Sequence, residues 1–185
     1  MSPYIQQFIE AMSPNICWEL YPEYIEGFTE SQIDIYAEAL DMEINGAFRE
    51  WLLTFGKCSG GLFTQDHFNH YHGSRDSKNN LAYLRMYPEF RRDMLDDGRI
   101  TNEQLNLKPF NLYWENEVDH YFILTKDPEL FVWFFTDSYD GGYAMNTGLK
   151  FDDFIKSKLG KLSCRKGIWI EKNEIIEMSS SYIFE

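Results

Sequence analysis

The chain has 185 residues, of which 44% are hydrophobic and 17% aromatic, and its formal net charge is −13. This length predicts a single domain with its own core, and the composition excludes disorder as the overall state of the chain. The acidity disfavours direct binding to nucleic acid, because lysine and arginine side chains that neutralise phosphates supply most of that affinity.

The acidic charge is concentrated in residues 1–50, which we call the acidic front. This segment has ten acidic side chains and a single basic one, Arg49, and therefore a net charge of −9. An acidic surface attracts basic partners, although it can also serve only to keep a protein in solution. Residues 156–172 have six basic side chains and one acidic side chain, a net charge of +5. They form either a solvated surface or an intramolecular docking site for the acidic front.

The sequence predicts a cytoplasmic protein that does not contact membranes. No apolar run approaches the roughly 20 residues that cross a bilayer. The first twelve residues have neither the basic start nor the continuous apolar stretch of a signal peptide. The three cysteines, Cys17, Cys58 and Cys164, have no CxxC spacing, which favours reduced thiols over a disulfide framework or a zinc ribbon.

Helical periodicity dominates the first third of the chain. A helix is predicted near residues 3–12, where a proline opens a run of apolar residues at helical spacing. A second helix is predicted over residues 29–40, because Thr29 and Gln32 have the spacing of a capping box.

A third helix is predicted over residues 44–56, with Gly56 as its C′ glycine. The chain then passes through a Gly-Gly pair into a short predicted strand at residues 61–64. The aromatic residues on one face of the third helix are expected in the core: Phe48, Trp51 and Phe55.

Later segments predict a sheet. Three runs with strand character are separated by short polar turns, and an antiparallel meander is the simplest arrangement of these runs: residues 111–115, 120–125 and 130–137. The last run is apolar on both faces, as expected of a central strand. The sequence from Asp140 to Tyr143 is typical of a turn. A helix is predicted to begin at Phe151 and to end at Gly160.

Two further segments lie outside this plan. Residues 80–97 predict two short helices separated by Pro88. The final residues, 166–185, contain two runs with strand character on either side of Lys172 and Asn173, which predicts a C-terminal hairpin.

A histidine cluster is the sharpest local candidate for catalysis, since His67, His70 and His72 lie near Asp66. Imidazole is the commonest metal ligand, and closely spaced histidines can converge on one ion. The intervals of three and two residues do not place all three rings on one face of a helix or strand, which favours a solvated loop or strand edge. His120 is predicted to be structural.

The chain has no signature of a catalytic nucleophile or of a common nucleotide site. The motifs GxSxG, GxGxxG and GxxxxGKS/T do not occur in it. We therefore expect no catalytic residues and no cofactor.

Two segments combine into a recognisable pattern. Residues 39–63 contain a leucine, a short turn, an aromatic-Arg-x-aromatic-Leu helix and a Gly-Gly exit, and residues 108–137 with 151–155 contain a Pro-Phe strand, central strands and a Phe-x-x-Phe helix. This pattern resembles the SUKH superfamily, which includes the fungal Smi/Knr regulators of glucan synthesis and many bacterial immunity proteins. The matching positions are Leu40, Phe48, Arg49, Trp51, Leu52, Gly60, Gly61, Pro109, Phe110, Phe122, Val132, Trp133, Phe151 and Phe154.

The resemblance covers roughly residues 29–160 and implies a single SUKH-like α+β domain, in which an antiparallel or mixed sheet is wrapped by helices. Residues 1–28 are then an N-terminal helix and lead-in. Residues from about 66 to about 105 are a helical insertion, which is longer than the family's usual connection. Residues 161–185 are a C-terminal β extension.

The resemblance also implies a non-enzymatic protein-binding module, and in bacteria such modules neutralise a cognate toxin, often a nuclease. Nuclease surfaces tend to be basic because their substrate is a polyanion, which agrees with the acidic front. Two alternatives remain, a regulatory scaffold of the Smi/Knr type and, less favoured, a small metal-dependent hydrolase built on the histidine cluster. The candidate contacts with a toxin or other basic protein are exposed acids and an aromatic residue near the Gly-Gly loop: Glu43, Glu50, Asp66, Tyr71, Glu115, Glu117 and Asp119.

Overall fold

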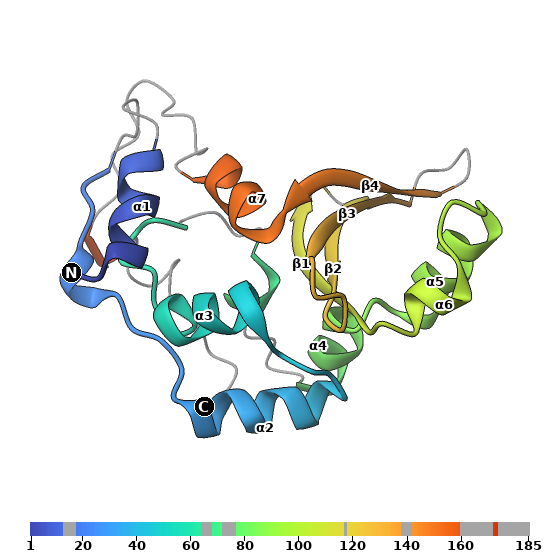
Figure 1. Ribbon diagram of the computed structural model, residues 1–185, viewed down its shortest axis with the longest axis horizontal. Helices are drawn as coiled ribbons and strands as arrows, with labels where there is room; N and C mark the ends of the chain where they lie inside the picture. The colour runs from blue at the N-terminus through green and yellow to red at the C-terminus, as the bar shows by residue number, and fades with distance from the viewer. Residues whose placement is uncertain are drawn as a thin grey trace.

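A computed structural model of the chain describes residues 1–12, 18–63, 68–71, 77–116, 118–137, 142–159 and 172–173. The predicted α+β class is confirmed, because helices and one antiparallel sheet make up this part of the chain (Figure 1). None of its helices is both long and apolar enough to cross a membrane. In chain order the elements are α1 (Pro3–Ala11), the 3-10 helix η1 (Pro22–Tyr24), α2 (Glu30–Leu40), α3 (Gly46–Phe55), the 3-10 helix η2 (Asn69–Tyr71), α4 (Ser77–Leu84), α5 (Pro88–Asp96), α6 (Asn102–Leu105), β1 (Pro109–Glu115), β2 (Asp119–Leu124), β3 (Phe131–Thr136), β4 (Tyr143–Lys150) and α7 (Phe151–Lys158).

Local sequence determines where the first two helices begin. The Ser2 hydroxyl accepts a hydrogen bond of 3.2 Å from the Ile5 amide at the start of α1. At α2 the Gln32 amide donates to the Thr29 hydroxyl (3.2 Å), and the Thr29 amide donates to the Gln32 side chain (2.9 Å). Both bonds satisfy amides that have no partner inside the helix, so the predicted capping box is confirmed.

Helix α3 ends at Phe55, but the prediction that Gly56 is a C′ glycine is wrong. Gly56 has a φ of −59° and a ψ of −26°, in the right-handed helical region instead of the left-handed one. A close contact explains the glycine, because a Cβ atom here would lie 2.4 Å from the Leu52 carbonyl oxygen and 2.6 Å from the Phe28 ring. Gly56 therefore lets the chain before α2 approach the end of α3.

The strand predicted at residues 61–64 is also wrong for the three residues that are described. Residues 60–63 form a turn, and the last residue of that prediction lies outside the described part. Gly60 and Gly61 have φ values of 62° and 95°, a conformation that breaks an extended strand. Phe63 is nevertheless buried in the core, so its apolar character reflects burial and not strand structure.

The four strands form a single antiparallel sheet in the order β1-β2-β3-β4. The predicted meander is confirmed, and β3 has a neighbour on each side as expected of its apolar sequence. Strand β4 was not predicted, because the sequence around Asn146 and Gly148 has low strand propensity and Tyr143 was placed in a turn. Ala144 in this edge strand donates its amide to the Asp97 carboxylate (3.2 Å), which blunts the edge against pairing with another chain.

A bulge in β1 places aromatic residues on one face of the sheet. Phe110 pairs with Ile123 and Tyr113 pairs with Tyr121, so three steps along β1 match two steps along β2. The additional residue, Leu112, lets Phe110 and Tyr113 point to the same side although their separation is odd. Both side chains are fully buried in the larger core.

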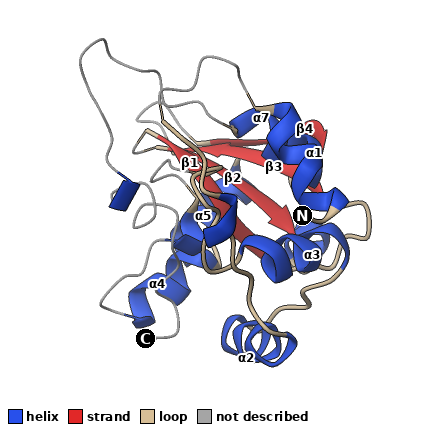
Figure 2. Ribbon diagram, turned by 90° about the vertical axis from the view of Figure 1, so that its left-hand side faces the viewer, coloured by secondary structure: helices blue, strands red, loops and turns tan. Residues whose placement is uncertain are grey.

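The sheet lies between two helical layers, with α1, α3 and α7 on one side and α5 and α6 on the other (Figure 1). Alternation along the strands supplies both cores, since Ile123 belongs to the first and Phe122 to the second. Figures 1 and 2 both place α2 beneath α3 at the periphery of the molecule. The first core is the larger one and contains most of the aromatic side chains, including Trp51.

The region predicted as a helical insertion contains α4, α5 and α6. Pro88 begins α5, and three residues separate it from the end of α4, which confirms the two short helices predicted on either side of a break. The C-terminal hairpin falls outside the described residues except for Lys172 and Asn173. The residues from 138 to 141, at the predicted turn before β4, also lie outside them.

Trp51 provides a direct test of the larger core. Its side chain is fully buried, with ring centroids 5.7 Å from Phe63 and 5.8 Å from Phe151. Trp51→Ala is expected to lower the free energy of unfolding by about 3–5 kcal/mol. Ile35→Ala, which truncates an exposed apolar side chain of α2, is the control and should change it by less than about 0.5 kcal/mol. Equal shifts of the two urea midpoints would contradict the core assignment.

Candidate partner-binding surface

The structure places one member of the histidine cluster in the core, so the predicted solvated setting is wrong for His70. His70 is fully buried, and its ring centroid lies 4.3 Å from that of Trp51 and 6.4 Å from that of Phe68. His67, His72 and Asp66 lie outside the described residues. Within the described part of the chain, no group of three or more His, Cys, Asp and Glu side chains is arranged to hold a metal ion.

His120 occupies the second core. Its ring packs against Phe90 (4.7 Å between centroids) and Phe135 (6.2 Å), and the side chain is almost fully buried. Burial lowers the pKa of His120 to about 4, against a smaller opposing effect of the carboxylates of Asp137 and Asp119. The ring is therefore neutral at pH 7, as a structural histidine requires.

Glu115 is committed to an internal contact. Its carboxylate pairs with the ammonium group of Lys158 and accepts a hydrogen bond from the Tyr121 hydroxyl (3.2 Å). The Lys158 side chain is only 6% exposed. The rings of Tyr113 and Tyr121 surround its Nζ atom at 4.6 Å and 4.3 Å. This contact fastens α7 to the sheet and makes Glu115 a structural residue.

The other predicted contacts do not form one patch. Glu43 pairs with Lys126 (2.8 Å) at the end of the sheet where β2 finishes. Asp119 lies at the opposite end of β2, beside Glu115, and the six residues of β2 separate those ends by about 17 Å. Glu50 is exposed on α3. Glu117 and the side chain of Tyr71 lie outside the described part.

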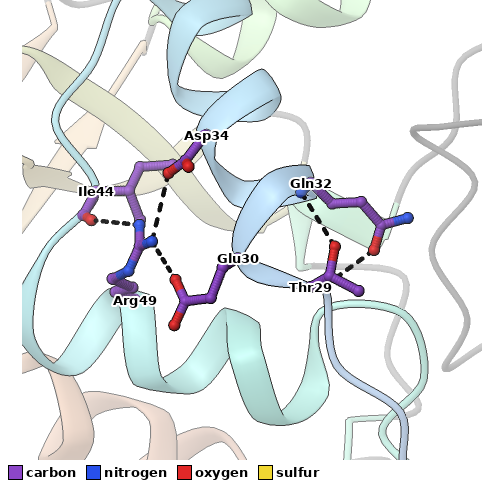
Figure 3. Close-up of polar contacts among 6 residues, drawn as sticks. All are labelled: Thr29, Glu30, Gln32, Asp34, Ile44 and Arg49. Carbon is purple, nitrogen blue, oxygen red and sulfur yellow. Dashed lines mark hydrogen bonds and ion pairs between the residues drawn. The ribbon is translucent and has the colours of Figure 1, made fainter.

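Arg49, the single base of the acidic front, joins α3 to α2 (Figure 3). Its guanidinium contacts the carboxylates of Glu30 and Asp34 and donates to the Ile44 carbonyl oxygen at 3.3 Å. One cation shared by two carboxylates leaves the exposed side of α2 negative. Bases from outside the front pair with four more of its acids, in the pairs Glu23–Lys172, Glu26–Lys57, Asp41–Lys108 and Glu43–Lys126.

An acidic segment that sequence analysis did not single out lies directly on the Gly-Gly turn. We call residues 18–26 the strap. The buried Trp18 donates its indole N–H to the Gly61 carbonyl oxygen (2.9 Å), and the Tyr21 amide donates to the Gly60 carbonyl oxygen (2.9 Å). These bonds fix the strap to the Gly-Gly turn, near which the sequence predicted contacts with a partner.

Two further features hold the strap in place. The amides of Glu26 and Cys58 each donate to the other residue's carbonyl oxygen at 2.9 Å, and the Glu26 carboxylate pairs with Lys57 (2.6 Å). Gly60 has a positive φ, and a Cβ atom there would lie 2.5 Å from the Tyr21 carbonyl oxygen. The approach of the strap therefore requires glycine at position 60.

The strap presents two tyrosine rings and an acid as an open site, which we call the tyrosine clamp (Tyr21, Glu23 and Tyr24). The ring centroids are 6.5 Å apart, and the rings are inclined by 82°. Lys172 places its Nζ atom 4.6 Å and 4.7 Å from the two centroids and 3.8 Å from the Glu23 carboxylate. The arrangement binds a primary ammonium group by cation–π and ionic contacts.

The available sequence signal for the clamp is the Tyr-Pro-Glu-Tyr run. Pro22 begins η1, and the two tyrosines that flank it are three residues apart, which brings their rings together.

Comparison of the chain with family models, with curated proteins and with solved structures finds no match.

His120 predicts a pH dependence of stability. An unfolded histidine takes up a proton near pH 6.5, whereas the folded chain does so only near pH 4, so this residue lowers the free energy of unfolding as the pH falls through that window. The shift corresponds to about 3 kcal/mol. His120→Leu should remove this contribution. Between pH 7 and pH 4, the free energy of unfolding should therefore fall by about 3 kcal/mol less in the variant than in the wild type. Parallel curves for the two proteins in urea denaturation would contradict a neutral buried ring.

The Glu115–Lys158 contact predicts an asymmetry between two substitutions. Glu115→Gln leaves a buried ammonium group without its carboxylate and should lower the free energy of unfolding by about 2 kcal/mol. The loss is smaller than for a fully buried pair, because the Glu115 side chain is 37% exposed. Lys158→Met removes the buried charge and keeps the apolar stem, so it should cost less. Urea denaturation measures both variants. A larger loss for Lys158→Met would show that the carboxylate is not what stabilises the ammonium group.

Proposed function

We propose that this chain is a non-enzymatic protein-binding module that neutralises a basic cognate toxin, as its resemblance to the SUKH superfamily implies. The observation that carries the proposal is the attachment of an acidic, aromatic strap to the Gly60–Gly61 turn. Glu19, Glu23 and Glu26 are all exposed on this strap, and the strap itself has no basic residue. The order of helix pair, Gly-Gly turn, antiparallel meander and closing helix also supports the resemblance.

A surface of this kind acts through the rate of association. Exposed carboxylates steer a basic partner toward the strap and select against acidic proteins, while the aromatic rings supply contact area after encounter. A nuclease toxin would present the positive site that binds its polyanionic substrate. Occupation of that site by the acidic surface inhibits the nuclease without any catalytic step in this chain.

Two alternatives predict different outcomes. A regulatory scaffold of the Smi/Knr type would use a similar surface but would bind a partner that is not a toxin. A hydrolase built on the histidine cluster is less favoured, because His70 faces Trp51 in the core. Stoichiometric zinc or iron in the purified protein, found by elemental analysis, would favour the hydrolase.

The proposal predicts salt-dependent association with the product of the neighbouring gene, since an immunity protein is normally encoded beside its toxin. The association rate should fall steeply as salt rises, whereas the dissociation rate should change less. The triple substitution Glu19→Gln, Glu23→Gln and Glu26→Gln should slow association by about fivefold at low salt. Stopped-flow or surface kinetics measures both rates.

A matched triple variant separates the strap from net charge alone. Glu89→Gln, Asp96→Asn and Glu103→Gln remove the same charge from α5 and α6 and should slow association by less than about twofold. A salt-independent association rate, or an acidic partner, would contradict the proposal. Equal slowing by the two triple variants would show that the strap has no special role.

A further inference from the structure

The tyrosine clamp already binds a cation that belongs to this chain. Lys172 lies between the rings of Tyr21 and Tyr24, with Glu23 completing the site at 3.8 Å. The lysine is remote in sequence from all three residues. The contact therefore shows which ligand chemistry this surface accepts, an ammonium or guanidinium group on a flexible stem.

The clamp is open to solvent. The Lys172 side chain is 43% exposed and the Glu23 side chain 62% exposed. Ion pairs with this exposure contribute little to stability, because water and salt screen them. A second cation at the surface can therefore replace Lys172 at small cost.

A second lysine in the same chain provides the contrast. Lys158 is also surrounded by aromatic rings and paired with a carboxylate, but its side chain is 6% exposed. That site is closed, and its lysine is a permanent part of the fold. The clamp combines the same groups in an accessible form.

The clamp is also preformed. Hydrogen bonds of 2.9 Å from Trp18 and Tyr21 fasten the strap to the Gly-Gly turn, and Pro22 restricts the backbone between the two rings. A ligand that enters a preformed site does not have to order it first, which favours binding.

We infer that the tyrosine clamp is the subsite that receives a lysine or arginine side chain of the basic partner, and that Lys172 occupies it in the unbound chain. The inference rests on the proposed function. It adds a specific point of recognition and an internal competitor. Removal of Lys172 should then strengthen binding of a cationic ligand by more than the removal of another exposed lysine charge does.

The test uses the full chain and an acetylated hexa-arginine amide labelled for fluorescence anisotropy. Lys172→Met should tighten binding of this peptide by about threefold, because the internal competitor is gone. Lys150→Met removes the same charge from an exposed pair with Glu129 and is the control, with an expected change below about 1.5-fold. Equal effects of the two variants, or no effect of Lys172→Met, would overturn the competition.

The rings are tested separately from the charge. Tyr24→Leu keeps the net charge and should weaken peptide binding by about fivefold when made in the Lys172→Met protein. Tyr143→Leu, made in the same protein, is the control. Tyr143 lies on β4, away from the clamp in sequence, and its ring also contacts a cation, since the guanidinium carbon of Arg99 lies 4.8 Å from the ring centroid. Circular dichroism and melting curves confirm that each variant is folded. If the Tyr24→Leu and Tyr143→Leu variants bind the peptide with the same affinity, the assignment of the clamp as the cation subsite is overturned.

The peptide experiment and the association experiment can fail separately, so failure of the clamp is distinguishable from failure of the proposed function. Peptide binding that depends on salt but not on Tyr24 would remove the clamp and leave an acidic surface that recruits a basic protein. A salt-independent association rate with the product of the neighbouring gene would remove the toxin partner, whatever the peptide does.

Discussion

The close approach of the strap to the Gly60–Gly61 turn is the contact on which the candidate surface depends. A side chain at position 60 would meet the Tyr21 carbonyl oxygen at 2.5 Å, so glycine is needed for the backbone hydrogen bonds that fix residues 18–26. The turn is itself anchored, because Phe63 beside it is buried against Trp51. The core thereby positions an exposed group of acids and rings without contributing a residue to it.

Two lysines in this structure show how burial changes the use of the same chemistry. Lys158 and Glu115 are held between α7 and the sheet, where an unpaired charge would be costly, so the pair specifies how the helix docks. Lys172 and Glu23 meet at the surface, where the pair is weak and exchangeable. Six of the ten carboxylates of the acidic front pair with five basic side chains, so the front together with these partners remains negative.

Predictions from sequence succeeded where local interactions decide the structure. The capping box at Thr29 and the meander of β1–β3 follow from side chains close in sequence. Strand β4 was missed because tertiary pairing with β3 overrides its weak propensity. The candidate contacts were chosen by exposure near the Gly-Gly loop, and sequence could not show that Glu115 faces a lysine 43 residues away. The strap was missed for the same reason, since its position depends on hydrogen bonds to a distant turn.

A structure of the complex with the product of the neighbouring gene would decide whether the strap is the binding surface. We expect a lysine or arginine side chain of the partner to lie between Tyr21 and Tyr24 and to contact Glu23, with Lys172 displaced from the clamp. A complex in which the partner contacts α5 and α6 on the other side of the sheet, with Lys172 still seated between the two tyrosines, would contradict it.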